Sequence, residues 1–332
     1  MLILPALGFL LLHLASRRND PPQPAESALI SQQFLVEGKA YSVVGGNAWK
    51  RSDSGGWTFI EQLYEPDFFE KNYAVKDGRT FRKDPGSGKM YEMRKTFKSG
   101  FEDAATIREL IGETQGWTAF TLQSPQSSSI PDYVALRTAI LKGEGTFLDN
   151  RIEPSTELAH SGKSSLRTFS VAPGSGMVTA KASLETEFLH FTKGDDYWFS
   201  GWFYVKSGMP FTLMDIESAW LNEHPGMRIM IDNGALLLEM KWADKPRYVQ
   251  SAPLVKFPSG KWVRVKTHLK LSEKEDGVIE LWQDEKQIVS AKGRTLPLAD
   301  TIYNSLEVGI SATSQEATLF VDDVEVSDKE IK

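Results

Sequence analysis

The sequence of 332 residues predicts an all-β protein, built as an antiparallel sandwich. From about residue 98 to the C-terminus, short stretches alternate apolar and polar residues, a pattern with the period of half-buried strands. Turn residues separate these stretches, as in Lys-Gly-Asp-Asp at 193–196 and Asp-Asn-Gly at 232–234. Helical periodicity is scarce. Many short strands with little helix are typical of sandwiches rather than of α/β folds.

The composition describes an ordinary globular chain. Apolar residues make up 41% and charged residues 25% of the sequence. The net charge of −6 argues against a nucleic-acid partner, because binding to phosphates requires an excess of basic residues. The chain has no cysteine, which excludes disulfides and thiolate metal sites.

The N-terminus predicts export. Residues 1–18 form a short apolar run that ends in Arg17 and Arg18, and they fit a signal peptide or a membrane anchor. The basic pair follows the run instead of preceding it, so uncleaved membrane anchoring is the alternative. Residues 19–33 are expected to be a Pro-rich linker. The expected location is the periplasm, the cell surface or the surrounding medium.

Residues 34–97 are predicted to form a small β-rich unit of unassigned role. Hairpin turns are expected at Lys-Asp-Gly, 76–78, and at Asp-Pro-Gly-Ser-Gly, 84–88. After this unit, residues 101–113 contain enough helical pattern for one short turn, and residues 123–132 are expected to be a loop.

Residues 98–328 are predicted to form the main domain, and its strand-like stretches carry the sandwich prediction. The predicted strands are residues 164–171, 182–191, 197–205, 211–220, 226–232, 235–242, 262–271, 278–289 (a hairpin), 305–312 and 317–326. No internal repeat of fixed period is present.

Asp322 in the last predicted strand raises the question of how a carboxylate is tolerated there. Alternation places it on one face with Phe320, Val324 and Val326. A lone buried charge is costly unless it is paired or bound to a metal. Two other segments bear on this question: Ser-Gly-Phe-Glu-Asp-Ala at 99–104, and the stretch at 157–170 that contains His-Ser-Gly-Lys.

Together with Asp322, these segments resemble calcium-binding jelly-roll domains such as many carbohydrate-binding modules. The resemblance implies one structural Ca²⁺, held by the carboxylates of Glu102 and Asp322 and by backbone carbonyls of His160, Gly162 and Lys163. Ca²⁺ takes six to eight oxygen ligands, which suits this set. The alternative is a β-bulge in which Asp322 accepts hydrogen bonds from backbone N–H groups.

The predicted strands also offer polar and aromatic residues that a glycan would need. Aromatic rings stack on sugar faces, and charged side chains bond hydroxyl groups. The candidate ligand-binding residues are Glu185, Glu187, Trp198, Trp202, Asp215, Glu217, Glu239 and Lys241. The alternative is an ordinary solvated sheet face, with the tryptophans packed under a loop.

Residues 160–171, 197–205 and 260–289 resemble polysaccharide lyases of the heparin lyase I and glucuronan lyase type. The resemblance implies a concanavalin A-like, antiparallel jelly-roll sandwich that acts on or binds a polysaccharide. Lyase chemistry needs a group that neutralises a uronate carboxylate, a base and an acid.

The alginate-lyase relatives supply these groups from an Arg–x–Glu strand, a Gln–Ile–His strand and a Tyr–x–Lys–x–Gly–x–Tyr strand. The matching strands here depart from those patterns. They carry Ser183 in the first, Asp215 and Glu217 in the second, and Ser305, Glu307 and Ser311 in the third. The expected groove is therefore acidic, which suits an anionic polyuronate badly.

The sequence thus predicts an exported polysaccharide-binding protein that has lost the usual catalytic set. The first alternative is an active lyase that cleaves a uronate-containing glycan by β-elimination. Its candidate catalytic residues are His190, His224, Arg228 and Tyr303. The second alternative is a structural or adhesive surface protein.

Overall fold

The structure is a computed structural model, and it describes residues 22–31, 33–36, 39–44, 47–52, 54–62, 73–83, 88–218, 226–242 and 245–332. The predicted signal or anchor and His224 lie outside the described residues. Among the described helices, none combines the length and the apolar composition that a membrane crossing requires.

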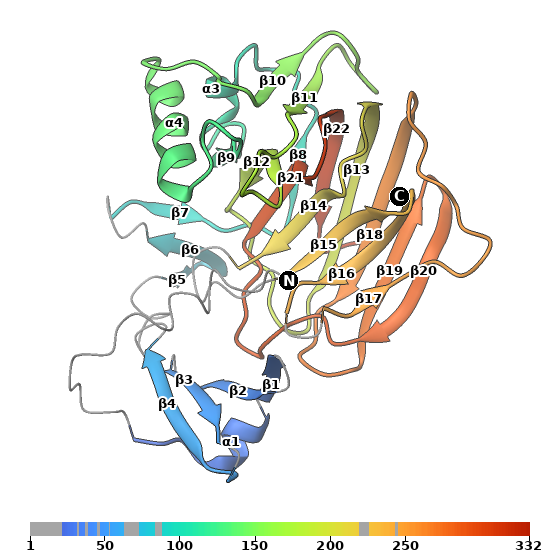
Figure 1. The fold of residues 1–332 in the computed structure, drawn as a ribbon. Coiled ribbons are helices and arrows are strands. Elements are labelled where there is room, and N and C mark those ends of the chain that lie inside the picture. Colours follow the sequence, from blue (N-terminus) through green and yellow to red (C-terminus); the bar gives the residue numbers. More distant parts are fainter. Residues whose placement is uncertain are drawn as a thin grey trace.

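Two large antiparallel sheets form the body of the molecule, as the sequence predicts (Figure 1). The first sheet has eight strands, and β8 pairs with β22 beside the main path. In spatial order its main path runs β10 (Arg151–Ser155), β11 (Ser165–Ser170), β22 (Ala317–Ser327), β13 (Asp196–Ser207), β18 (Trp262–Lys270), β19 (Gly277–Gln283) and β20 (Lys286–Gly293), and β8 spans Phe97–Ser99.

The second sheet has seven strands and lies against the first. Its order is β17 (Arg247–Tyr248), β16 (Ala235–Met240), β15 (Met227–Asp232), β14 (Thr212–Glu217), β21 (Ser305–Thr313), β12 (Ala180–Thr186) and β9 (Ala119–Thr121). Alternate residues of both sheets point inward and form one continuous hydrophobic core, with Phe199 and Phe203 from β13 facing residues such as Leu184 and Ile216. The all-β sandwich is therefore confirmed.

The predicted β-rich unit of residues 34–97 contains two small sheets. One is formed by β1 (Gln33–Val36), β2 (Lys39–Val44), β3 (Asn47–Arg51) and β4 (Trp57–Gln62), next to helix α1 (Glu26–Ser31). The other is formed by β5 (Tyr73–Lys76), β6 (Arg79–Lys83) and β7 (Met90–Glu92). The predicted turn after Lys76 is present, with positive φ at Asp77 and Gly78.

Two helices accompany the sandwich. Helix α3 (Ile107–Leu110) is the short turn expected there. Helix α4 (Ile130–Lys142) is not predicted by the sequence pattern, because its apolar residues are spread around the helix instead of following one face, and Ile140 is its one buried residue. Its signals lie at its ends: Ser129 and Asp132 form a capping box, and Gly143 adopts the left-handed conformation after the last turn.

The predicted face of Asp322 is only partly right. Asp322 lies opposite Trp202, on the side of β22 that faces away from the core. A bulge with φ +45° at Asp323 then shifts the register, so that Val324 and Val326 point into the core. Asp322 therefore shares a face with Phe320 but not with the two valines.

Candidate functional site

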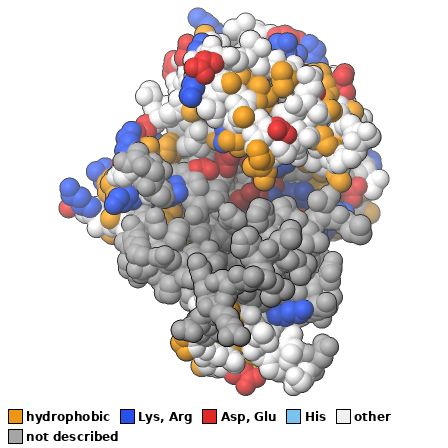
Figure 2. All heavy atoms as spheres, turned by 60° about the vertical axis from the view of Figure 1, so that its left-hand side comes forward, with side chains coloured by type: hydrophobic (Ala, Val, Ile, Leu, Met, Phe, Trp, Pro, Cys, Tyr) orange, Lys and Arg blue, Asp and Glu red, His pale blue; other side chains and the backbone are white. Residues whose placement is uncertain are grey.

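The most polar part of the sandwich is the outer side of the seven-stranded sheet, which we call the charged face. Register partners lie on the same side of a sheet, and here they form a row of ionic residues across six strands. In spatial order the row is Arg247, Glu239, Arg228, Asp215, Glu307 and Glu185. Figure 2, which brings the left of Figure 1 forward, shows acidic and basic side chains gathered in the shaded middle of the view.

Glu239 joins two arginines at one end of this row. Its carboxylate is fully buried and accepts a hydrogen bond from Arg228 Nε at 2.9 Å and another from Arg247 Nε at 2.7 Å. A buried carboxylate is tolerated when charged donors satisfy both of its oxygens. The arginines remain partly exposed, so this end of the charged face presents positive charge to a ligand.

Asp215 lies in the middle of the row and is almost completely buried. It accepts hydrogen bonds from Lys241 Nζ at 2.9 Å and from the Ser311 hydroxyl, and Lys241 also pairs with Glu217. Burial acts to raise the pKa of Asp215, but the charges of Lys241 and Lys181 outweigh it and hold the pKa below its usual range. Asp215 is therefore ionised at neutral pH.

The opposite end of the row is rich in carboxylates. Burial, and then the neighbouring charge of Glu185, raises the pKa of Glu187 to about 8. Burial also raises the pKa of Glu307, against the opposing charge of Lys181. Ser305 Oγ donates to Glu185 at 2.7 Å, and Ser183 donates to Glu307. A carboxyl that stays protonated at neutral pH can donate a hydrogen bond to a ligand oxygen.

Several members of this cluster were not predicted from the sequence. Lys181 lies one residue before the predicted strand, yet it continues the alternation Lys181, Ser183, Glu185 on β12. Its ammonium interacts with Glu307, which raises its pKa. Helix α4 brings Tyr133 within electrostatic range of Lys181, and burial raises the pKa of this phenol. Nothing in the sequence of β12 indicates that α4 packs beside it, so the proximity of Tyr133 to Lys181 could not be predicted.

The four catalytic candidates do not form one constellation in the described residues. Arg228 lies on the charged face but is committed to Glu239. Tyr303 is fully buried and donates its hydroxyl to the Thr295 carbonyl at 2.8 Å, a structural role in the core. His224 lies outside the described residues.

His190 lies at the margin of the charged face. Its ring packs against Tyr73 with centroids 5.8 Å apart, and the charge of Glu187 in turn acts on that tyrosine. Burial, and then the charge of Lys95, lowers the pKa of His190, so its imidazole is neutral at pH 7. Its Nδ1 is buried without a hydrogen-bond partner.

Trp198 and Trp202 are separated from the charged candidates, so the eight candidate ligand-binding residues do not line one surface. Both tryptophans belong to β13 of the eight-stranded sheet and point away from the core. The charged candidates belong to the other sheet, so the core lies between the two sets. Trp202 is covered by a loop, because His160 stacks on it with ring centroids 3.6 Å apart.

The predicted calcium residues do meet. Asp322 is fully buried, and its carboxylate accepts backbone N–H bonds from His160 at 2.8 Å, Ser161 at 3.2 Å and Asp323 at 2.8 Å. Glu102 accepts from the backbone N–H of Lys163 at 3.0 Å. Both carboxylates thus fasten the loop that follows β10.

The geometry of this loop matches the backbone alternative more directly than the calcium one. Gly162 has φ +61°, and a Cβ there would lie 2.2 Å from Glu102 Oε1, so only glycine fits under the carboxylate. Burial raises the pKa of Asp322 to about 6. Within the described ranges, no three acidic or histidine side chains are grouped as a metal site. Calcium, which would also use carbonyl oxygens, stays a prediction.

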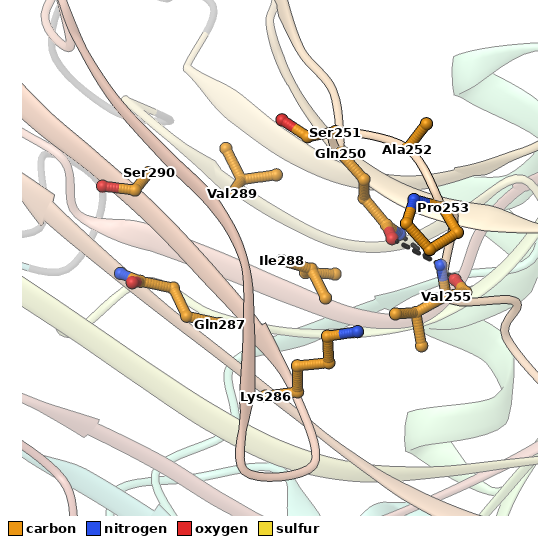
Figure 3. Close-up of a pocket in the computed structure, with 10 residues that line it drawn as sticks. All are labelled: Gln250, Ser251, Ala252, Pro253, Val255, Lys286, Gln287, Ile288, Val289 and Ser290. Atoms are coloured by element: carbon orange, nitrogen blue, oxygen red, sulfur yellow. Dashed lines mark hydrogen bonds between the residues drawn. The ribbon is translucent and has the colours of Figure 1, made fainter.

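A cavity of about 340 Å³ lies away from these residues, between the loop at 250–255 and β20 (Figure 3). Gln250 points into this region, but its amide is used by the loop: Oε1 accepts from Val255 N at 2.9 Å, and Nε2 donates to Val255 O at 3.2 Å. The amide of Gln250 is therefore not free to bind a ligand in this cavity.

Comparison with known proteins assigns the family. A polysaccharide lyase family model matches residues 110–325, which cover most of the chain and every strand of the two large sheets except β8 and the last residues of β22. The chain belongs to this polysaccharide lyase family. No curated protein matches the sequence.

Solved structures with a similar arrangement include lyases. An endo-β-1,4-glucuronan lyase from the fungus Trichoderma reesei has 12% identity and a TM-score of 0.47, covering 65% of this chain and 92% of its own. A cellulose-induced protein, Cip1, has 15% identity and a TM-score of 0.47, with coverages of 71% and 98%. The alginate lyase Aly36B has 10% identity and a TM-score of 0.40, with coverages of 72% and 99%.

Proposed function

We propose that this protein binds a polysaccharide on the charged face of its seven-stranded sheet, without the usual lyase catalytic set. The observation that carries the proposal is the ionic row from Arg247 to Glu185, which lies in register across that sheet. Membership of the polysaccharide lyase family supports a glycan as the class of partner.

The charged face has complementary ends for an acidic sugar chain. Arg228, Arg247 and Lys241 are partly exposed and supply positive charge for uronate carboxylates. Glu185 and Glu187 at the other end supply hydrogen-bond partners for hydroxyl groups. The groove expected from the sequence was acidic, and Arg228 and Lys241 add positive charge beside its carboxylates.

The departures from the lyase pattern support binding without cleavage. Ser183, Glu307 and Ser311 occupy the strands from which the relatives' cation and tyrosines are expected, and all three side chains hydrogen-bond within the sheet. We also propose that residues 1–18 direct export of the protein, because it would then reach polysaccharides outside the cell.

An active lyase is the second candidate, and one observation favours it. Tyr133 on α4 and Lys181 on β12 lie close enough for their charges to interact, beside Glu185 and Glu307. One of these two groups could act as the base that removes the proton next to a uronate carboxylate, and the other as the acid that protonates the leaving oxygen when the glycosidic C–O bond breaks.

Binding and cleavage can be separated in one experiment on the full chain. Uronate-containing and neutral polysaccharides are presented on an array, and unsaturated products are followed by ultraviolet absorbance. We expect retention of a uronate glycan without absorbance. Arg247→Ala should weaken retention about three- to tenfold, and Lys98→Ala on β8 of the other sheet is the matched control.

Other outcomes have clear meanings. Absorbance that disappears in Tyr133→Phe establishes the lyase candidate. If no uronate polysaccharide is retained, or if Lys98→Ala weakens retention as much as Arg247→Ala does, the charged face is not the binding surface.

A further inference from the structure

The outer side of the eight-stranded sheet carries a group of large aromatic residues, separate from the charged face. None of them belongs to the hydrophobic core, and all are partly exposed. They are Trp198, Trp202 and Tyr204 from β13, Trp262 from β18 and Trp282 from β19. The whole core lies between these residues and the charged face, so one ligand cannot contact both at the same point.

The two ends of this aromatic group differ. At one end, His160 stacks on Trp202 and meets Trp262 edge-on at 5.9 Å, so the loop after β10 closes that end. At the other end, the rings of Trp198 and Trp282 have centroids 5.8 Å apart and planes inclined by only 27°. We call this pair the tryptophan platform.

The tryptophan platform is supported from one side. The ring of His268 lies parallel to Trp198, with an interplanar angle of 8° and centroids 4.1 Å apart. Each nitrogen of His268 is 2.8 Å from a carboxylate oxygen, Nε2 from Asp196 and Nδ1 from Glu280. The imidazole is therefore fixed in position, and it fixes the plane of Trp198. A platform that is rigid before binding loses little conformational entropy when a ligand stacks on it.

The polar groups around the platform are paired with one another. Lys270 Nζ bonds Asp196 at 2.9 Å, and Gln287 Nε2 donates to Glu280 at 3.0 Å. Lys266 Nζ lies 4.8 Å from the centroid of Trp282 and bonds the Ile331 carbonyl at 3.3 Å, so the C-terminal residues form a wall beside the platform. Charges balanced in this way favour an uncharged ligand that can share hydrogen bonds with them.

We infer that the tryptophan platform is a second glycan-binding site, which takes neutral sugar rings. The flat C–H face of a pyranose stacks on indole, and its hydroxyls reach the carboxylates and amide at the rim. Partly exposed aromatic side chains with a fixed plane and a balanced polar rim suit this ligand better than they suit an anionic polyuronate. The site is independent of the charged face, and so is its test.

The test uses affinity electrophoresis of the full chain in gels that contain hydroxyethyl cellulose, xyloglucan or dextran, with polygalacturonate in parallel. Trp198→Ala and Trp282→Ala should each weaken retention by at least one neutral polymer about tenfold, as expected for the loss of a stacked ring. Trp198→Phe should retain part of the affinity. Trp262→Ala, at the covered end, is the matched control and should behave as the wild type. Polygalacturonate retention should not change in any variant.

A wild-type measurement covers the case in which a variant does not fold. Hydroxyethyl cellulose or xyloglucan should shield tryptophan fluorescence of the wild-type protein from quenching by acrylamide. The inference is overturned if no neutral polymer retards or shields the wild type, if folded Trp198→Ala and Trp282→Ala bind as the wild type does, or if Trp262→Ala loses binding equally.

Discussion

Glu187 lies beside Glu185 at the end of β12, where burial and that neighbour raise its pKa to about 8 from an ordinary value of 4.5. The folded protein therefore holds this proton more tightly than the unfolded chain does. The contribution of Glu187 to stability is fully present below pH 4.5 and is lost as the pH rises through about 8. Glu187 is one of the sequence-predicted residues whose environment only the fold reveals.

Replacing Glu187 with Gln should remove this pH dependence. At pH 9 we expect the variant to unfold with a free energy roughly 2 kcal/mol higher than that of the wild type, with little difference at pH 5. Chemical denaturation at both pH values measures the effect. Glu153→Gln on β10 is the control, because Glu153 pairs with Arg167 on the other sheet. An equal difference at both pH values would contradict the assignment.

Asp323 shows why a residue-level pattern can mislead. Strict alternation along 317–326 requires Asp322, Val324 and Val326 to share a face. The bulge at Asp323 adds a residue against β13 and reverses the faces beyond it. Strand periodicity alone does not locate this bulge. The carboxylate of Asp322 on an apolar face was the one sequence signal for it, and only the pairing with β13 gives its position.

At the scale of elements, helix α4 is held by its ends more than by its buried face. Asp132 N donates to Ser129 Oγ at 3.3 Å, and Ser129 N donates to Asp132 Oδ2 at 3.2 Å. This reciprocal pair satisfies backbone donors that the first turn leaves open. The spacing Ser–x–x–Asp with Pro131 was readable in the sequence, but the scarce apolar periodicity concealed the helix.

Ser129→Ala should therefore destabilise the protein by about 1 kcal/mol, the usual cost of losing an N-cap. Because α4 carries Tyr133 toward Glu185, one of the proposed binding residues, the variant should also weaken retention of a uronate glycan. Thermal and chemical unfolding measure the first effect, and the glycan array measures the second. Ser128→Ala, one exposed residue earlier, serves as the control. Unchanged stability in Ser129→Ala would show that the cap is not formed in solution.

At the scale of the whole molecule, the loop after β10 joins the start of the main domain to its end. Glu102 follows β8, Asp322 lies on β22, and both bond the backbone of residues 160–164. β8 also pairs directly with β22. Positions 102 and 322 therefore lie at the same loop, while the bound ion stays a prediction.

Calcium should raise the melting temperature of the wild-type protein if it binds there, because it would neutralise Asp322 and cross-link both ends of the domain. A ligand at a hundredfold excess over its Kd stabilises by about 2.7 kcal/mol. Thermal unfolding in calcium and in chelator measures this effect. Asp322→Asn should lose the response, and Glu325→Gln, on the same strand, should keep it. Equal melting of the wild type in both conditions would favour the backbone-bonded loop without metal.

The sequence by itself determined the all-β sandwich and most of its strands. The meeting of residues 102 and 322 was expected only from the resemblance to calcium-binding jelly-roll domains. Period-two alternation and turn chemistry are local, and a chain encodes them directly. It also marked Glu185, Asp215 and Glu239 as candidate ligand-binding residues, although in one set with Trp198 and Trp202 of the other sheet.

The tertiary structure alone decided which side chains face one another. Strand order placed the tryptophans on one sheet and the ionic row on the other, brought Tyr133 to Lys181, and paired Glu239 with two arginines. These relations depend on which strands become neighbours and on where a bulge shifts their register. Contacts between distant segments are set by the packing of the whole core, so no local pattern in the chain could state them.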